Sequence, residues 1–222
     1  MIPIKRLPAP DVLARNEDRW RTAFLEQRAK DPQKRPSSKQ YAHPDVVSAL
    51  EAMSHHKCFY CEQSTKQTRR EVDHYIDVAE DPTRAFTWAN LYLACWECNH
   101  QKQPHRAIPV TDCLDPCAPG TQPSAHLMFE KELIRAREGS TQGLATIKKY
   151  RLDRKDLDHK RLKQLQLFNE ALVRIKDAQI ADGRKDMNEN EKALLRSFCQ
   201  PDFPFSLMFR VYLERHGLYS SH

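Results

Sequence analysis

Two short cysteine pairs constrain the fold of this chain more than any other feature. Cys58 and Cys61 form one Cys-x-x-Cys pair, and Cys95 and Cys98 form the other. Each pair can lie on one tight turn, and four thiolates are what a closed tetrahedral structural zinc site needs. The stretch between the pairs, residues 62–94, is longer than the gap in common zinc ribbons, so we expect a sizeable insertion there. The sequence therefore predicts a core organised around a structural zinc ion.

The alternative for these cysteines is two unrelated pairs, one of them redox-active. Three further cysteines stand apart, and Cys113 and Cys117 could join a metal site, although unpaired thiols in a proline-rich loop are the favoured interpretation. Cys199 is expected to be buried. The first residues lack an apolar stretch of signal-peptide length, so we expect a reducing, cytoplasmic environment rather than a disulfide framework. No stretch approaches the length of a membrane span.

The insertion between the pairs contains residues that can carry chemistry. Residues 71–75, Glu-Val-Asp-His-Tyr, read as a strand, and Asp73 and His74 project to opposite sides if that strand is regular. A site that uses both side chains therefore requires a twist or bulge. Residues 87–93 read as a second strand, and residues 99–102 can start a helix.

Read in order, Cys-x-x-Cys, Asp-His, Asn and Cys-x-x-Cys-Asn-x-x-Lys resemble the HNH endonuclease family over residues 58–102. The resemblance implies two strands and a helix around one catalytic divalent metal ion, and it implies cleavage of a phosphodiester backbone.

The same resemblance implies a role for each matching residue. His74 would be the general base, Asp73 would bind the catalytic metal, and Asn90 would hold the loop that carries His74. Asn99 would bind the same metal, and Lys102 could contact a phosphate.

The last residue of the family motif is a histidine or an asparagine, so His100 could replace Asn99 as the ligand. Magnesium is the expected ion and manganese the alternative, because a hard divalent ion neutralises phosphate charge while an imidazole can deprotonate water near neutral pH. Taken singly, each residue also has an ordinary structural explanation, such as a turn acid or a helix cap. Their order along the chain favours the nuclease.

Short stretches outside this block are similar to the PtuB family of HNH proteins in bacterial Septu and retron defence systems. The matching stretches begin at Phe86, Leu114, His126 and Arg151. This similarity implies anti-phage defence, DNA or RNA as the substrate, and control by a partner ATPase of the ABC or SMC-like type, called PtuA.

We expect an α+β fold that is mainly helical. It divides into an N-terminal helical flank (1–57), the nuclease core (58–102), a proline-rich connection with a short β-ribbon (103–139) and a C-terminal helical region (140–222). A helix from Pro44 should place Val47, Leu50 and Met53 on one face.

In the C-terminal region, apolar residues recur at three- and four-residue spacings after Asp153, so a long helix should begin with Asp153 as N-cap and end by Gly183. Asn188 and Glu191 resemble a capping box that starts another helix.

Charge adds little to the choice between functions. The chain has 36 basic and 30 acidic residues, a net charge of +6, which favours a polyanionic partner only mildly. A zinc-knuckle module that binds nucleic acid without cutting it, and an adaptor whose helices dock a partner, both remain open. The binding module does not explain why Asp73, His74 and Asn99 stand at nuclease spacing, and the adaptor role is compatible with a nuclease in the same chain.

Overall fold

The computed structural model describes residues 1–66, 68–102, 105 and 107–219. Within that part of the chain, no helix is long and apolar enough to cross a membrane. The first helices are α1 (Asp11–Ala14), α2 (Glu17–Lys30), α3 (Ser38–Tyr41) and α4 (Pro44–Ser54).

The sequence of α4 explains both of its ends. Pro44 stands in the first turn, where a missing N–H costs nothing, and the Nδ1 atom of His43 accepts a hydrogen bond from the backbone of Asp45. At the other end His55 adopts a left-handed conformation, with φ 53°. The expected buried face is nearly correct: Leu50 and Met53 are buried, but Val46 is buried in place of Val47.

Two antiparallel strands and one helix form the centre of the molecule. Strand β1 (Arg70–His74) pairs with β2 (Leu91–Cys95) in a register that is continuous through His74 and has no bulge there, and α5 (Trp96–Lys102) follows directly. The second strand is shorter than the prediction of 87–93, because Trp88–Asn90 forms a 3-10 turn before it.

The remaining elements are short 3-10 turns at Pro82–Arg84, Val110–Asp112 and Pro123–Ala125, the hairpin β3 (Leu127–Glu130) and β4 (Leu133–Ala136), and helices α6 (Thr141–Tyr150), α7 (Lys155–Ala181), α8 (Glu189–Ser197) and α9 (Ser206–Arg215).

The hairpin and the capping box at Asn188 are confirmed. The N-cap prediction at Asp153 is wrong, because α7 begins one residue later with Arg154 at the cap position. Asp153 forms an ion pair with Arg151 instead.

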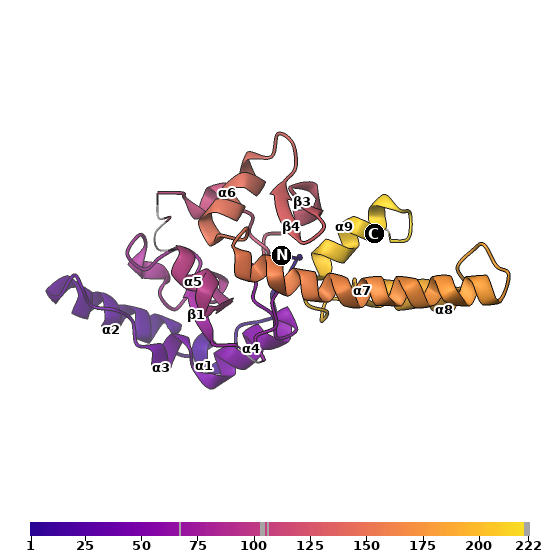
Figure 1. Cartoon of the computed structure of the whole chain (residues 1–222). Coiled ribbons are helices and arrows are strands. Elements are labelled where there is room, and N and C mark those ends of the chain that lie inside the picture. The colour runs from indigo at the N-terminus through magenta and orange to yellow at the C-terminus, as the bar shows by residue number, and fades with distance from the viewer. Residues whose placement is uncertain (67, 103–104, 106, 220–222) are drawn as a thin grey trace.

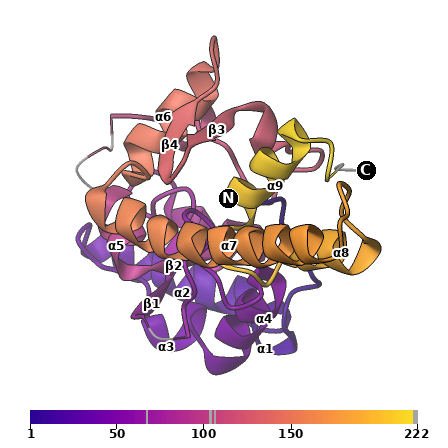
Figure 2. The same ribbon diagram turned by 45° about the vertical axis from the view of Figure 1, so that its right-hand side comes forward.

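Helices α7 and α8 form a two-helix arm that extends away from the ββα unit, and α2 extends in the opposite direction (Figure 1). In Figure 2 α7 crosses the face of the molecule, with the N-terminal helices on one side and β3, β4 and α6 on the other. The expectation of a mainly helical α+β fold is confirmed.

The hydrophobic core runs without a break from the N-terminal helices through the ββα unit to the C-terminal helices. Its fully buried members include Leu13, Leu50, Phe86, Phe168 and Phe209. A buried polar contact adds to this continuity, because the Ser206 hydroxyl at the start of α9 donates to Glu62, directly after the first cysteine pair, over 2.9 Å. The C-terminal helices are therefore part of the same folded unit as the ββα centre.

Candidate metal centre and candidate active site

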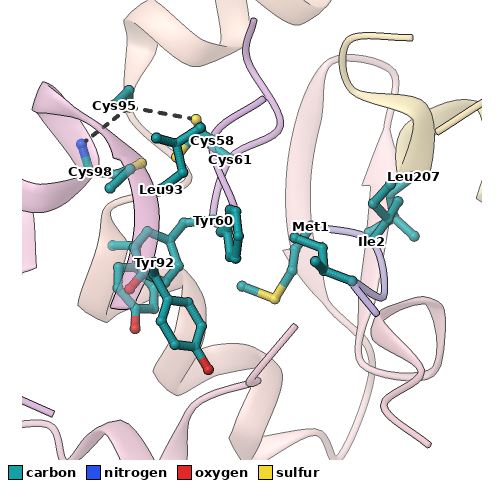
Figure 3. Packing of buried hydrophobic residues seen from close by; sticks show 14 of the residues in the cluster. Met1, Ile2, Cys58, Tyr60, Cys61, Tyr92, Leu93, Cys95, Cys98 and Leu207 are labelled. Atoms are coloured by element: carbon teal, nitrogen blue, oxygen red, sulfur yellow. Dashed lines mark hydrogen bonds between the residues drawn. The ribbon is translucent and has the colours of Figure 1, made fainter. Parts of the chain in front are cut away.

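The four paired cysteines form one buried cluster. Their sulfur atoms all lie within 4.8 Å of one another, and the Sγ atoms of Cys61 and Cys95 are 3.8 Å apart. Four sulfurs at about 2.3 Å from a zinc ion, arranged as a tetrahedron, are separated by about 3.8 Å. Figure 3 shows the four side chains gathered beside Leu93. The cluster therefore fits a zinc ion in ligand type, number and spacing.

Arg154 lies against this cluster although it is 56 residues away from Cys98 in sequence. Its Nη1 atom donates to Cys98 over 3.4 Å, and its Nη2 atom lies 4.0 Å from the Cys95 sulfur. Burial alone would lower the pKa of Arg154, but the neighbouring thiolates outweigh burial and raise it. Since four thiolates exceed the charge of one zinc ion by two, Arg154 offsets part of the remaining negative charge. Sequence reasoning missed this residue.

His74 stands at the end of β1. Its Nε2 atom is 2.8 Å from the carbonyl oxygen of Ala85, and the ring of Tyr41 packs edge-on against it at 4.6 Å between centroids. A carbonyl can only accept, so Nε2 carries the hydrogen and Nδ1 keeps its lone pair. Burial lowers the pKa of His74, which favours the neutral imidazole at pH 7. Within the part of the chain that the structure describes, Nδ1 of His74 has no hydrogen-bond partner, an arrangement that suits a base.

Asn90 closes the loop between β1 and β2. Its Oδ1 atom accepts from the backbone N–H of Ile76 over 2.7 Å, and its Nδ2 atom donates to the carbonyls of Ile76 (3.0 Å) and Arg84 (3.2 Å). Arg84 directly precedes Ala85, whose carbonyl meets His74. The buried amide of Asn90 thus fixes the segment that orients the His74 ring.

Asp73 faces the opposite way, toward α5. Its carboxylate accepts from the hydroxyl of Tyr60 over 2.6 Å and from the ammonium of Lys102 over 2.9 and 3.0 Å. Lys102 also donates to the carbonyl of His74 and is only 3% exposed. Lys102 is therefore directed into the protein, toward Asp73, rather than outward as a phosphate contact requires.

Asn99 has a different partner. Its Nδ2 atom donates to Oε2 of Glu71 over 2.7 Å, so its Oδ1 atom is turned away from Glu71. The other Glu71 oxygen is 3.1 Å from Arg69. His100 stacks on Trp96 at 4.1 Å between centroids, and its Nδ1 atom donates to the Trp96 carbonyl over 2.9 Å. Asp73 and Asn99 therefore lie on facing elements without a shared hydrogen-bond partner.

The side chains between β1 and α5 offer oxygen ligands. Glu71 and Asp73 are two residues apart on one strand and so share its face, and Asn99 projects from the facing helix. Carboxylate and amide oxygens are the ligands that Mg²⁺ and Mn²⁺ prefer, so Asp73 and Asn99 are of the right donor type for a hard divalent ion. In this structure Lys102 pairs with the Asp73 carboxylate, and Asn99 directs Nδ2 rather than its oxygen toward Glu71. Sequence reasoning did not assign Glu71 a role, although its spacing from Asp73 was a usable signal.

Comparison with known proteins matches residues 58–105 to a family model described as HNH endonuclease. This segment is an HNH domain. The chain is also 29% identical over 187 residues to a Septu protein PtuB of Bacillus mycoides, covering 70% of this chain and 60% of that protein. A Septu protein PtuB of Bacillus thuringiensis is 29% identical over 107 residues, which cover 47% of this chain and 38% of the relative. The matches thus span less than two thirds of either relative, and they confirm the HNH and PtuB resemblances.

Proposed function

We propose that this chain is a metal-dependent HNH endonuclease that hydrolyses phosphodiester bonds in DNA or RNA. The observation that carries this proposal is His74 in an HNH domain: its Nε2 atom is held by the Ala85 carbonyl, burial lowers its pKa, and Nδ1 has no hydrogen-bond partner among the described residues. A catalytic base needs this combination of a held ring and an unprotonated nitrogen.

In the proposed mechanism, Nδ1 of His74 takes a proton from the attacking water, and the imidazolium keeps its hydrogen bond to Ala85. Asn90 contributes by holding the loop that presents this carbonyl. Asp73 and Asn99 would hold a Mg²⁺ or Mn²⁺ ion, which when bound neutralises phosphate charge. Lys102 is a charge partner of Asp73 rather than a phosphate contact.

The similarity to proteins named Septu protein PtuB supports a role as the effector nuclease of an anti-phage defence system. We further propose that a PtuA-type ATPase controls this nuclease, as the resemblance to the PtuB family implies. The α7–α8 arm supports a docking role, because α7 exposes large apolar side chains along its length: Leu167 at 49%, Val173 at 59% and Ile180 at 68%. Of these, Val173 and Ile180 are seven residues apart and share one side of α7, where they offer an apolar strip to a partner.

A cleavage assay tests the enzymatic part of this proposal. Labelled plasmid, oligonucleotides and total RNA are incubated with the protein, with and without its co-purifying partner, in Mg²⁺ and in chelator. Cleavage is expected in Mg²⁺ alone, and it should be absent from His74→Ala but present in His159→Ala, a change at an exposed histidine on α7. Equal cleavage by His74→Ala and wild type would contradict the mechanism.

One observation favours a second function, a zinc-knuckle module that binds nucleic acid without cutting it. The Asp73 carboxylate is already neutralised by Lys102, as in a purely structural ion pair. Such a module would bind nucleic acid equally in chelator and in Mg²⁺, and no cleavage would appear in either condition.

A further inference from the structure

A cavity of about 480 Å³ lies beside the candidate active site, where α3 and the start of α4 face β1 and α5. Glu71 and Asn99 form part of its wall. Tyr41 also lines it, and the same ring packs against His74. The cavity therefore borders Glu71 and Asn99 directly, and it reaches His74 only through the ring of Tyr41. His74 itself is not part of the cavity wall.

The cavity has the size and lining of a site for a small planar molecule. Its volume falls within the range of ligand sites, roughly 300–1,000 Å³. The apolar part of the wall consists of Ala42, Val47, Val72 and Leu93 together with the Tyr41 ring. Aromatic and aliphatic walls of this kind accept the flat faces of nucleobases.

The charged groups of the cavity are compensated within the protein. Arg70 forms an ion pair with Glu51, and Glu71 forms one with Arg69 over 3.1 Å. A wall with paired charges offers no strong attraction to a phosphate group. It suits an uncharged ligand that brings its own hydrogen-bonding groups.

We propose that this cavity receives one unpaired nucleobase of the substrate, next to the phosphate that is cut. This inference rests on the proposed endonuclease function and narrows its substrate class to nucleic acid with an unpaired or extruded base at the cleavage site. A base inside a duplex is stacked on both sides and cannot enter a side cavity without leaving the stack.

Glu71 gives the cavity a preference among bases. Its carboxylate oxygens accept hydrogen bonds, and each has room for more than one donor. Adenine, cytosine and guanine carry exocyclic amino groups with two N–H donors, whereas unpaired thymine and uracil offer a carboxylate only the single ring N3–H. The first three bases should therefore be favoured over the last two.

The test compares matched oligonucleotides: a perfect duplex, and the same duplex with one unpaired nucleotide of each kind. Wild type should cleave the substrates with an unpaired adenine, cytosine or guanine at the higher kcat/KM. Ala42→Phe fills the cavity and should raise KM for these substrates on the order of tenfold while leaving the duplex unaffected. Ala29→Phe, at an exposed site on α2, is the matched control.

Ser38→Phe provides a second variant, because Ser38 is an exposed residue of the cavity wall and a phenylalanine there covers the cavity without entering the core. Thermal unfolding of both variants establishes that they fold. Two outcomes would overturn the cavity proposal: equal cleavage of paired and unpaired substrates by wild type, or an unchanged ratio of kcat/KM for unpaired over paired substrates in either folded variant. Neither outcome would contradict the proposal that the chain is an endonuclease.

Binding measurements separate the two proposals if no substrate is cut. Fluorescence anisotropy of a labelled single strand compares His74→Ala with His74→Ala/Ala42→Phe. Weaker binding by the double variant supports the cavity proposal even when the endonuclease proposal has failed, and equal binding overturns it. Loss of a protein partner by Ala42→Phe, with unchanged binding of the single strand, would identify the cavity as a protein-docking site and also overturn the proposal.

Discussion

The four-cysteine cluster and the candidate active site share one HNH domain but are built differently. In the cluster every ligand atom is buried and the sulfurs face one another within 4.8 Å. Around His74, Asp73 and Asn99 each functional group is held by a separate neighbour, namely Ala85, Lys102 and Glu71. The first arrangement is complete only when its members share one ion, and the second keeps each group oriented independently. The domain thus contains one group of residues that fits a shared ion and a second group in which each candidate catalytic side chain has its own partner.

The largest expected effect is that of removing a cysteine ligand. Cys58→Ser and Cys98→Ser should lose zinc, from about one ion per chain, and unfold the domain, because structural zinc contributes roughly 10–16 kcal/mol of folding free energy in small modules. That range is comparable with the total stability of a typical domain, about 5–15 kcal/mol. Elemental analysis and thermal unfolding measure both effects. Cys199→Ser, a buried cysteine outside the cluster, should keep its zinc, and folded wild-type protein free of zinc would refute the assignment.

The next effect separates chemistry from folding. His74→Ala should slow cleavage by about 10²–10⁴-fold, the usual contribution of a general base. Zinc content should be unchanged and thermal stability close to wild type, because the half-buried His74 ring lies outside the cysteine cluster. Kinetics and calorimetry on the same preparation test the separation. A large loss of stability in this variant would mean that the two sites are not independent.

Asp73 should affect both properties, because its carboxylate neutralises the buried Lys102. Asp73→Ala leaves that ammonium unpaired, which should cost about 3–5 kcal/mol. Asp73→Ala/Lys102→Met should recover most of the stability but none of the cleavage. High Mg²⁺ should partly restore cleavage by Asp73→Ala if Asn99 still holds the ion. Denaturant unfolding compares the variants, and equal stability of the single and double variants would exclude the buried pair as a stabilising contact.

A smaller effect concerns pH. Burial lowers the pKa of His74, so the neutral, reactive form should persist below the ordinary histidine pKa of about 6.5, and the acidic limb of the rate profile should lie below that value. Between the lowered pKa of His74 and about pH 6.5, the unfolded chain binds more protons than the folded chain. The contribution of His74 to the free energy of unfolding is therefore fully present above about pH 6.5, and it declines as pH falls toward the lowered pKa. Comparison of wild type with His74→Ala isolates both effects. A rate profile whose acidic limb lies above pH 6.5 would contradict a lowered pKa of His74.

The smallest effect on the chain itself is expected from the arm. Val173→Asp and Ile180→Asp change exposed positions on α7, so stability should shift by no more than about 0.5 kcal/mol, and zinc content and basal cleavage should stay unchanged. Binding to the proposed partner ATPase should be lost, which co-purification of the two proteins measures. Lys176→Asp, also on α7, shows whether charge alone produces the effect. Deletion of residues 153–222 would be a poor test, since α7 and α9 complete the core.

Sequence alone predicted the features that depend on local spacing. The cysteine turns, β1, the β3–β4 hairpin and the capping box at Asn188 follow from residues only a few positions apart. The direction of Lys102, the bond from Asn99 to Glu71 and the packing of Tyr41 on His74 depend on side-chain rotamers and on contacts between distant elements. Arg154 belongs to the same class, because nothing near it in sequence indicates the cysteine cluster.

The position of Arg154 also has a mechanical consequence. This residue caps α7 and touches Cys95 and Cys98, so the arm is attached to the cysteine turns at its base. A helix of 27 residues is about 40 Å long, so it acts as a lever, and a rotation of about 5° at the base moves the far end by about 3.5 Å. Cys98 and Asn99 are neighbours on α5, so a rotation that displaced Arg154 would act on the helix that carries Asn99.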